Sequence, residues 1–338
     1  MSPDRGRAST DDGRVVADIL LATHRRGDLL REMLSSLAGA DDLDGVRQIL
    51  LIENGARDGS EDVAREFEGV LPIRYEFVEE ANKSAALNEG LLMSDADLLI
   101  FFDDDVRVSP GTIAAYVDAA QRCGRGHFFG GRLTPWYEGE PPPQWLIPAL
   151  PYTATGFDLG PEEIPHHEFM GPNWAAFRQD LVEIGGFSTR LGPGSGLVGQ
   201  ETEAQSRLTA HGVQGVFLPG AHVEHFVPAH NLTVDWVRRR RYRHMLGRAL
   251  RARDSYEGPR IASVPRFLWR SYVEELLRVA RDRLLRPYTE ERVRGELRLM
   301  KVRAQIASHR LEVRGETVAG GDLSEGAEGS KGAHQRSD

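Results

Sequence analysis

Three consecutive aspartates, Asp103, Asp104 and Asp105, follow the apolar residues 98–102 in the segment DADLLIFFDDDVRVSP. Neighbouring carboxylates repel one another, so gathering them at the end of a buried strand requires a cation or hydrogen-bond donors that offset the charge. Mg²⁺ and Mn²⁺ prefer oxygen ligands and share the phosphate oxygens of bound substrates. The segment therefore predicts a site for a divalent cation and a nucleotide, and a solvated acidic turn is the alternative.

The aspartates must be positioned by a strand, and strand and helix patterns alternate along the first half of the chain. Four continuous apolar runs predict strands that are buried on both faces: residues 15–23, 46–54, 73–79 and 97–105. Helical patterns follow these runs at residues 27–39, 58–69, 82–94 and 109–123. This order predicts an α/β fold with a doubly wound, mostly parallel sheet.

In such a sheet, ligands bind at the carboxyl ends of the strands. Polar residues stand at the ends of all four predicted strands: Thr23 and His24, Glu53 and Asn54, Glu79 and Glu80, and the three aspartates. The coincidence predicts one site to which several strands contribute.

The second half of the chain is less regular. Segment 130–152 is rich in Pro and aromatic residues, which predicts irregular structure that acts as a lid or an acceptor loop. Helices are expected at 178–187 and 199–212, and a strand at 213–226 that runs into a loop. From Val234 onward two or three long helices are predicted, with breaks at Pro259, Pro265 and Pro287.

Composition indicates a globular chain without a disulfide. It has 338 residues, a net charge of −9 and one cysteine, Cys123, which suits a reducing compartment. Residues 1–14 lack the apolar region of a signal peptide, and no apolar run reaches the about 18 residues of a membrane span. A cytoplasmic location is expected, and peripheral contact with the inner face of the membrane is left open.

Positive charge is concentrated near the C-terminus. Residues 238–310 contain 21 Lys and Arg against 8 Asp and Glu, a net charge of +13, so the rest of the chain carries −22. The segment WVRRRRYRHMLGRALRAR is open to three interpretations: nucleic-acid binding, a solvated basic helix face, or a basic surface for a diphosphate, an anionic lipid or a lipid-linked acceptor. The amphipathic segment 264–288 could pack on the body, on a second subunit or on a membrane.

Six segments resemble, in order, those of the family 2 inverting glycosyltransferases, which have the GT-A fold. DLLIFFDDDVRVSP resembles the Asp-x-Asp segment of that family. The other five resemble the first strand and helix, the second strand and its turn, the third helix, the acceptor-side segment and a strand that delivers a histidine: ADILLATHRRGDLLREMLSSL, ILLIENGARDGSEDV, NKSAALNEGL, FMGPNWAAFRQDLVEIGGFSTRLGPGSGLVGQETEAQSRL and LPGAHVEHF. The resemblance covers about residues 15–250.

The resemblance implies two groups of donor-binding residues, one at strand ends and one on a helix: Thr23, Arg25 and Glu53, and Asn82, Lys83 and Asn88. Glu53 stands where the family usually has Asp. Lys83 suits a diphosphate, and a solvated helix lysine is the alternative.

The resemblance also implies a metal site for Mg²⁺ or Mn²⁺. Asp103 would contact the ribose or support the metal shell, Asp104 would lie beside the nucleotide sugar, and Asp105 would bind the metal. His225 would complete the metal site or contact the diphosphate. His222 is the alternative, since strand alternation places it on the same side, and a structural role for His225 is a further one.

The expected general base is Glu201 in the segment GQETE. The family usually has Gly-Glu-Asp-x-Asp/Glu here, and alignment on Gly199 places Gln200 at the Glu and Glu201 at the catalytic Asp. An ionised carboxylate within hydrogen-bond reach of an acceptor hydroxyl can accept its proton. Glu203 is the alternative base, and a third interpretation makes both glutamates surface residues of a helix.

The sequence therefore predicts a metal-dependent inverting glycosyltransferase of glycan, polysaccharide or glycoconjugate biosynthesis. The expected partners are a nucleotide-diphospho-sugar donor, with UDP ahead of GDP or dTDP, and a glycan, lipid-linked or small-molecule acceptor, without nucleic acid; a homodimer is left open. A sugar-nucleotide nucleotidylyltransferase is one alternative, although LATHRRGDLL lacks the glycine-rich loop of that class. A related fold that binds nucleotide or glycan without turnover is another. The G-x-G-x-x-G match at 194–199 follows no predicted strand, so dinucleotide binding is not predicted.

These assignments divide the chain into five segments: a disordered leader at 1–14, a nucleotide-sugar-binding α/β half at 15–130, an acceptor-side half with the base at 131–232, a basic helical extension at 233–314 and a disordered tail at 315–338.

Overall fold

The computed structural model describes residues 13–40, 43, 45–194, 199–251, 256–285 and 290–314. Within these residues, nine strands form one sheet, and a two-stranded hairpin lies apart from it. The disorder predicted at 1–14 and 315–338 falls outside the described residues, except for Gly13 and Arg14.

The elements have the following bounds. The strands are β1 (Ala17–Thr23), β2 (Val46–Asn54), β3 (Ile73–Val78), β4 (Leu98–Asp103), β5 (Val106–Val108), β6 (His127–Tyr137), β7 (Ile164–Pro165), β8 (Asn173–Phe177), β9 (Gln214–Val227), β10 (Arg260–Ile261) and β11 (Val264–Pro265). The helices are α1 (Gly27–Ala38), α2 (Ser60–Glu66), α3 (Lys83–Met93), α4 (Thr112–Cys123), α5 (Tyr152–Thr155), α6 (Arg178–Glu183), α7 (Gln200–Ala210), α8 (Val234–Arg251), α9 (Arg266–Leu285) and α10 (Glu290–Arg314), with short 3-10 turns η1 (Ile147–Ala149) and η2 (Ala229–Leu232).

The sheet has the strand order β3-β2-β1-β4-β8-β6-β9-β5, and β7 pairs with β9. Strands β1 to β4 are parallel, β8 is antiparallel to β4 and β6, and β6 is parallel to β9. The predicted α/β fold with a mostly parallel sheet is confirmed, and β2 has the predicted bounds. Because β1, β2 and β4 are parallel neighbours, their carboxyl ends meet at one edge, where the polar strand ends lie together.

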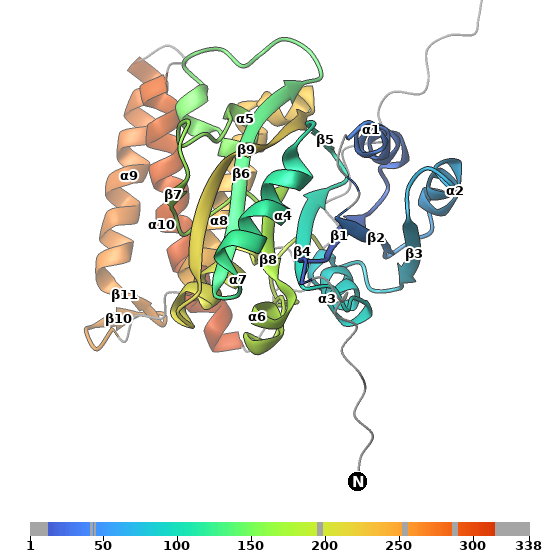
Figure 1. Ribbon diagram of the computed structural model, residues 1–338. Coiled ribbons are helices and arrows are strands. Elements are labelled where there is room, and N and C mark those ends of the chain that lie inside the picture. The colour runs from blue at the N-terminus through green and yellow to red at the C-terminus, as the bar shows by residue number, and fades with distance from the viewer. Residues whose placement is uncertain are drawn as a thin grey trace, which may run out of the picture.

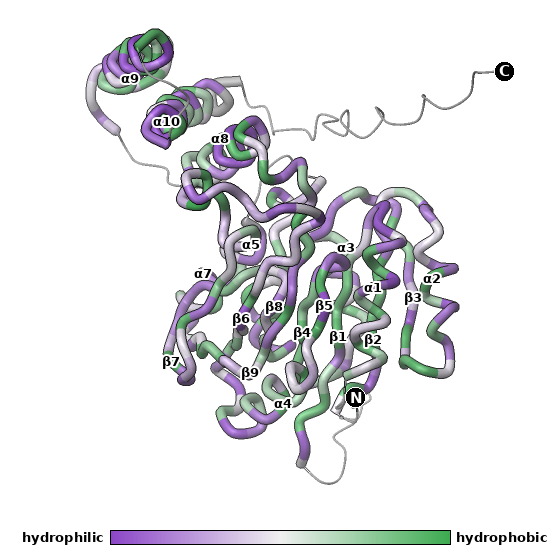
Figure 2. The backbone as a smooth tube through the Cα atoms, turned by 90° about the horizontal axis from the view of Figure 1, so that it is seen from above, coloured by the Kyte–Doolittle hydropathy of each residue, from purple (hydrophilic) through white to green (hydrophobic). Residues whose placement is uncertain are grey.

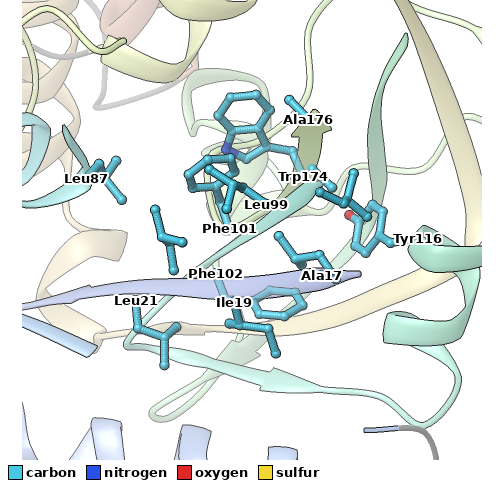
Figure 3. Close-up of a cluster of buried hydrophobic side chains, with 14 of the residues drawn as sticks. Ala17, Ile19, Leu21, Leu87, Leu99, Phe101, Phe102, Tyr116, Trp174 and Ala176 are labelled. Carbon is cyan, nitrogen blue, oxygen red and sulfur yellow. The ribbon is translucent and has the colours of Figure 1, made fainter. Parts of the chain in front are cut away.

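The core packs around the middle of the sheet. The side chains of Ile19 in β1 and Leu99 in β4 are fully buried. Phe101 stacks on Trp174 of β8 with ring centroids 4.5 Å apart, and Figure 3 shows this pair within the buried cluster that includes Tyr116 of α4. Close packing leaves little freedom to the end of β4, so the aspartates that follow it are held in place.

The segment predicted to be irregular at 130–152 begins inside a strand. β6 runs to Tyr137 and pairs with β9 along its whole length, so the predicted boundary between the two halves at 130 and 131 falls within β6. On the other side, β8 pairs only with residues 128–130. Pro135 of β6 has no backbone N–H to donate, but it lies beyond the part of β6 that pairs with β8. The strand can therefore contain a proline at this position.

The segment 213–226, predicted as a strand that runs into a loop, forms one strand, β9, which ends at Val227. Its pairing with β6 shifts register between Leu218 and His222, so Pro219 and Gly220 form an irregularity inside the strand. The strand then runs on to Val227 and carries His225 beside β5.

Helices α8, α9 and α10 form the predicted C-terminal extension. They lie beyond β6 and β9, away from β1 to β3, and α9 is the outermost of the three (Figures 1 and 2). Buried Val264 and Leu268 pack with Val302 and Ile306 of α10. Among the described helices, none has the length and apolar character needed to cross a bilayer.

Candidate functional site

The three aspartates form the carboxyl end of β4 and the turn that leads to β5. Asp103 is the last residue of β4, and Asp104 and Asp105 form the turn. Asp104 is 4% exposed and Asp105 is 8% exposed. The solvated acidic turn considered from the sequence is therefore wrong. Buried carboxylates require partners, and a cationic side chain from elsewhere in the chain contacts each of the three.

Arg26, the residue before α1, is the counter-ion of the turn. Its Nη1 lies 3.0 Å from Asp104 Oδ1 and 2.5 Å from Asp105 Oδ2. The Thr23 hydroxyl donates to Asp104 Oδ2 at 2.9 Å. Burial raises the pKa of Asp104 to about 6, with Asp105 and Asp103 adding to the effect of burial and Arg26 opposing it. Thr23 thus supports the turn, and Arg26 is a site residue that the sequence did not single out.

Arg25, which was expected at the nucleotide, has a different position from Arg26. Its backbone is in the left-handed region with φ of 54°, and its N–H donates to the Asp58 carboxylate. The Asp58 N–H in turn donates to Glu53 Oε1 at 2.7 Å, and Tyr75 donates its hydroxyl to Glu53. Glu53 is 1% exposed, and burial raises its pKa. The neighbouring arginines therefore differ: Arg26 binds the acidic turn, and Arg25 positions the loop beside Glu53.

Lys83 joins the acidic turn to the expected base. Its Nζ lies 2.5 Å from Asp103 Oδ1 and 3.2 Å from Glu201 Oε1. Its side chain is only 14% exposed, so the solvated helix lysine considered from the sequence is wrong. Burial disfavours the ammonium, but Asp103 and Glu201 outweigh burial and raise the pKa of Lys83. Burial likewise opposes the Asp103 carboxylate, and Lys83 reverses this and holds its pKa below the ordinary value.

The two glutamates of GQETE have different surroundings. Glu201 lies in the first turn of α7, where the helix dipole favours a carboxylate, and it accepts from Gln200 Nε2 at 2.6 Å as well as from Lys83. Glu203 is bound at 2.8 Å by both Nε and Nη2 of Arg207. Arg207 also donates to two backbone carbonyls of the α6–α7 connection. The geometry therefore separates a glutamate beside the acidic turn from one that anchors a loop.

Asn82 and Asn88 have partners within the protein. Asn82 caps α3 by accepting from Ser84 N at 2.9 Å, and its amide donates to Thr189 O at 2.8 Å. Asn88 exchanges two hydrogen bonds with the backbone of Phe187, at 2.8 Å and 2.7 Å. Both residues connect α3 to the segment before α7, and so they help to fix the position of Lys83 relative to Glu201.

Asp105 and His225 are the pair that best fits a divalent cation. Asp105 Oδ1 and His225 Nδ1 are buried atoms to which no hydrogen-bond partner is assigned within the described residues, and His225 Nε2 lies 3.6 Å from Asp105 Oδ1. Asp103, the other expected ligand, is paired with Lys83. Since no group of three or more His, Cys, Asp or Glu able to hold a metal occurs in the described chain, a cation here would need phosphate oxygens or water as further ligands.

The alternative metal ligand His222 is occupied on both ring nitrogens. Its Nδ1 lies 2.9 Å from Ser109 Oγ and its Nε2 lies 2.9 Å from Thr134 Oγ1. Burial lowers the pKa of His222. These contacts give His222 a structural position between α4 and β6, which leaves His225 as the histidine that faces the acidic turn.

Arg240 of the basic extension lies close enough to Glu201 for the two charges to interact. Its guanidinium lies 5.3 Å from the ring centroid of Trp236, which is also in α8. Burial lowers the pKa of Arg240, and the charge of Glu201 acts in the opposite direction. The basic segment as a whole was recognisable in the sequence, but no feature of the sequence distinguishes Arg240 from its neighbouring arginines.

Comparison with known proteins places these residues in context. The family model described as Glycosyl transferase family 2 matches residues 18–183, which include Arg26, Lys83 and the three aspartates. A validoxylamine A glucosyltransferase from Streptomyces hygroscopicus subsp. limoneus is 27% identical over 220 residues, which cover 58% of this chain and 48% of that protein. The succinoglycan biosynthesis protein ExoM from Rhizobium meliloti (strain 1021) is 27% identical over 235 residues, which cover 67% of this chain and 72% of that protein. The chain thus spans about half the length of the glucosyltransferase.

Two solved structures share the fold. GalNAc-T7 with UDP, GalNAc and Mn²⁺ aligns with a TM-score of 0.51 and 14% identity, over 72% of this chain and 53% of that chain. The mannosyltransferase PcManGT from Pyrobaculum calidifontis, in complex with GDP-Man and Mn²⁺, aligns with a TM-score of 0.51 and 15% identity, over 95% of this chain and 80% of that chain. At these identities the likeness establishes the fold alone, and it confirms the expected GT-A architecture.

Proposed function

Residues 18–183 belong to glycosyl transferase family 2, and on this premise we propose that the chain moves a sugar from a nucleotide-diphosphate donor to an acceptor hydroxyl, with inversion at the anomeric carbon. The observation that carries the proposal is the position of Lys83 between Asp103 of the acidic turn and Glu201 at the start of α7. Through this one side chain the acidic turn, where we propose that the diphosphate binds, contacts the glutamate that we propose as the general base.

Glu201 is the proposed base. The acceptor hydroxyl gives its proton to the Glu201 carboxylate while its oxygen attacks the anomeric carbon, and the bond to the diphosphate oxygen breaks on the opposite face. Glu203 is bound by two nitrogens of Arg207, so using it as the base would first require breaking that ion pair. The choice between the two glutamates that the sequence left open therefore falls on Glu201.

Basic side chains stabilise the diphosphate that leaves. An ammonium has three N–H donors. Lys83 donates two of them to Asp103 and Glu201, so the third can bind a phosphate oxygen. A phosphate that shares the ammonium also weakens its hold on Glu201 and so frees the base. Arg26 at the acidic turn and Arg240, whose charge interacts with that of Glu201, add further positive charge.

We include Mg²⁺ or Mn²⁺ in the proposal, held by Asp105 and His225. The buried Asp105 Oδ1 supports this, because it accepts no hydrogen bond within the described residues. The two solved structures of the same fold contain Mn²⁺, which adds support. Such a cation would supply further neutralisation of the diphosphate charge.

The donor is proposed to carry UDP, ahead of GDP or dTDP, with the nucleoside beside Glu53. The structures with UDP and with GDP-Man support this class of donor. The glucosyltransferase and ExoM support an acceptor in glycan or glycoconjugate biosynthesis, either a glycan, a lipid-linked sugar or a small molecule. The cytoplasmic location and a peripheral contact of the basic helices with a membrane belong to the same proposal.

A thermal-shift panel tests the function. The full chain is heated with UDP, GDP, dTDP and their sugars, each with and without Mn²⁺. One nucleotide should stabilise the protein in a Mn²⁺-dependent way, by about 2.7 kcal/mol when its concentration is about 100 times the dissociation constant. Release of the nucleoside diphosphate from the matching sugar nucleotide then separates an enzyme from a protein that binds without turnover. If no nucleotide shifts the melting temperature under either condition, the proposed function is wrong.

A further inference from the structure

The exposed apolar side chains of this protein gather in one place. Eleven large hydrophobic residues are exposed in the described chain, and seven of them lie between Ile261 and Leu285, in the hairpin and α9. Leu277 is 65% exposed and Leu284 is 84% exposed. Single exposed hydrophobic residues are ordinary on protein surfaces, but a contiguous group on one element marks an interaction surface.

Helix α9 has one buried face and one exposed apolar face. Leu268, Val279 and the buried Asp282 share one face, which packs toward α10. At about 100° per residue, four other residues fall on another part of the helix surface: Val273, Leu276, Leu277 and Leu284, hereafter the α9 outer face. The sequence left open which of these residues pack on the body, and the structure divides them into a buried and an exposed set.

Charge surrounds the α9 outer face. Arg270 and Arg281 border it, and their side chains are 84% and 58% exposed. Each forms an ion pair within α9, with Glu274 and Asp282 respectively, and an exposed guanidinium has further N–H donors for a headgroup. The segment 238–310 around it carries a net charge of +13, and the rest of the chain carries −22. An anionic surface therefore attracts the extension and repels the body, which orients the molecule with the outermost helix toward that surface (Figure 2).

A second copy of this chain is a poorer occupant. A two-fold symmetric dimer brings the same patch of both subunits together, so two extensions of net charge +13 would face each other. A bilayer with anionic lipids instead offers an apolar layer to the leucines and negative headgroups to the arginines. An interfacial helix also agrees with the finding that none of the described helices can cross a membrane.

We propose that α9 is a membrane-docking helix, whose outer face of Val273, Leu276, Leu277 and Leu284 inserts at the surface of an anionic bilayer while Arg270 and Arg281 contact lipid headgroups. Docking rests on the peripheral membrane contact included in the proposed function and names the helix and side chains that make it. It does not depend on the chemistry at the acidic turn. It places the sugar-transferring body beside the membrane and so favours acceptors that are presented at its surface.

Vesicle flotation of the full chain tests the docking. Vesicles of phosphatidylcholine alone are compared with vesicles of phosphatidylcholine and phosphatidylglycerol, at low and high salt. The protein should float with the anionic vesicles, and added salt should weaken the binding. The double variant Leu277→Asp with Leu284→Asp should bind at least about tenfold more weakly, because two leucine side chains can no longer insert into the bilayer and two charges would enter its apolar layer.

Leu92→Asp is the matched control, since Leu92 is 73% exposed but lies on α3 of the body. It should bind vesicles like the unaltered chain. Circular dichroism melts show whether each variant is folded. The double variant Arg270→Gln with Arg281→Gln, which keeps the leucines, gives a second test: it should bind anionic vesicles more weakly than the unaltered chain at low salt. Equal binding of the leucine variant and the control, or no binding of the unaltered chain to anionic vesicles, overturns the proposal. So does light scattering that shows a dimer which only the leucine variant dissociates.

Discussion

Lys83 Nζ lies 3.2 Å from Glu201 Oε1, although the two residues are 118 positions apart in the chain. The same ammonium lies 2.5 Å from Asp103 Oδ1. Two carboxylates that would otherwise repel each other are therefore held close together by one largely buried cation. The contact links the acidic end of β4, where a diphosphate is proposed to bind, to the start of α7, where the proposed base lies.

The neighbouring arginines allow a matched comparison. Arg26→Gln removes the counter-ion of Asp104 and Asp105, so the free energy of unfolding should fall by about 1–2 kcal/mol and nucleotide affinity by at least about tenfold. Arg25→Gln should change both by much less, because its backbone N–H rather than its guanidinium makes the contact with Asp58. Urea denaturation and calorimetric titration with the nucleotide measure the two effects. Equal losses in both variants would contradict the assignment of Arg26.

Gly171 leaves room for the proposed base. A Cβ atom at this position would lie 2.5 Å from Glu201 Oε1, so Gly171→Ala should displace the carboxylate. Turnover should fall about tenfold because a base moved from its position transfers protons poorly, while stability changes by less than about 1 kcal/mol. Gly139→Ala, where nothing lies within 4 Å of the added atom, is the control. Steady-state kinetics in which Gly171→Ala behaves like Gly139→Ala would count against Glu201.

Variants of the two histidines of β9 distinguish a metal-binding role from a structural one. His225→Ala and Asp105→Asn should abolish the Mn²⁺-dependent part of nucleotide stabilisation in a thermal-shift measurement. His222→Ala loses the contacts with Ser109 and Thr134 and should cost about 1–3 kcal/mol of stability, yet retain the Mn²⁺ dependence. If His222→Ala loses that dependence and His225→Ala keeps it, the roles are reversed.

Glu53 makes the stability dependent on pH. Burial raises its pKa in the folded state above the unfolded value of about 4.3, so the folded chain binds the proton more tightly than the unfolded chain. Stability contributed by protonated Glu53 is full below about pH 4 and is lost as pH rises through the folded pKa. Glu53→Gln should therefore gain stability relative to the unaltered chain as pH rises from about 4 to 7. A difference in unfolding free energy that stays constant over this range would show that Glu53 is not responsible.

The first half of the fold could be predicted because its signals are local. Continuous apolar runs and helical spacing fixed β2 at its observed bounds, and the predicted helix at 27–39 differs from α1 by one residue. Strand β6 could not be predicted, because Pro135 argues against a strand unless its neighbours are known. Only the sheet order reveals that β8 ends before it reaches Pro135.

The site was predictable as a set of motifs but not as a network of contacts. The aspartates, Lys83 and Glu201 each lie in a recognisable segment of the sequence, and the structure brings Asp103, Lys83 and Glu201 into contact. Arg26 was missed because the choice between adjacent arginines depends on the left-handed backbone at Arg25, which no residue type signals here. The separation of Glu201 from Glu203 likewise depends on Arg207 and on Lys83, which is distant in the chain.

Comparison of Glu201→Gln with Glu203→Gln tests the proposed chemistry most directly, through release of nucleoside diphosphate in a single turnover and nucleotide affinity by calorimetry. Glu201→Gln should bind the nucleotide at least as well as the unaltered chain, because Lys83 is freed for the diphosphate, while its rate falls by about 10²–10⁴-fold. Glu203→Gln should lose stability through Arg207 and keep its rate within about tenfold. An unchanged rate in Glu201→Gln, or an equal loss in Glu203→Gln at full nucleotide affinity, would contradict the assignment of the base.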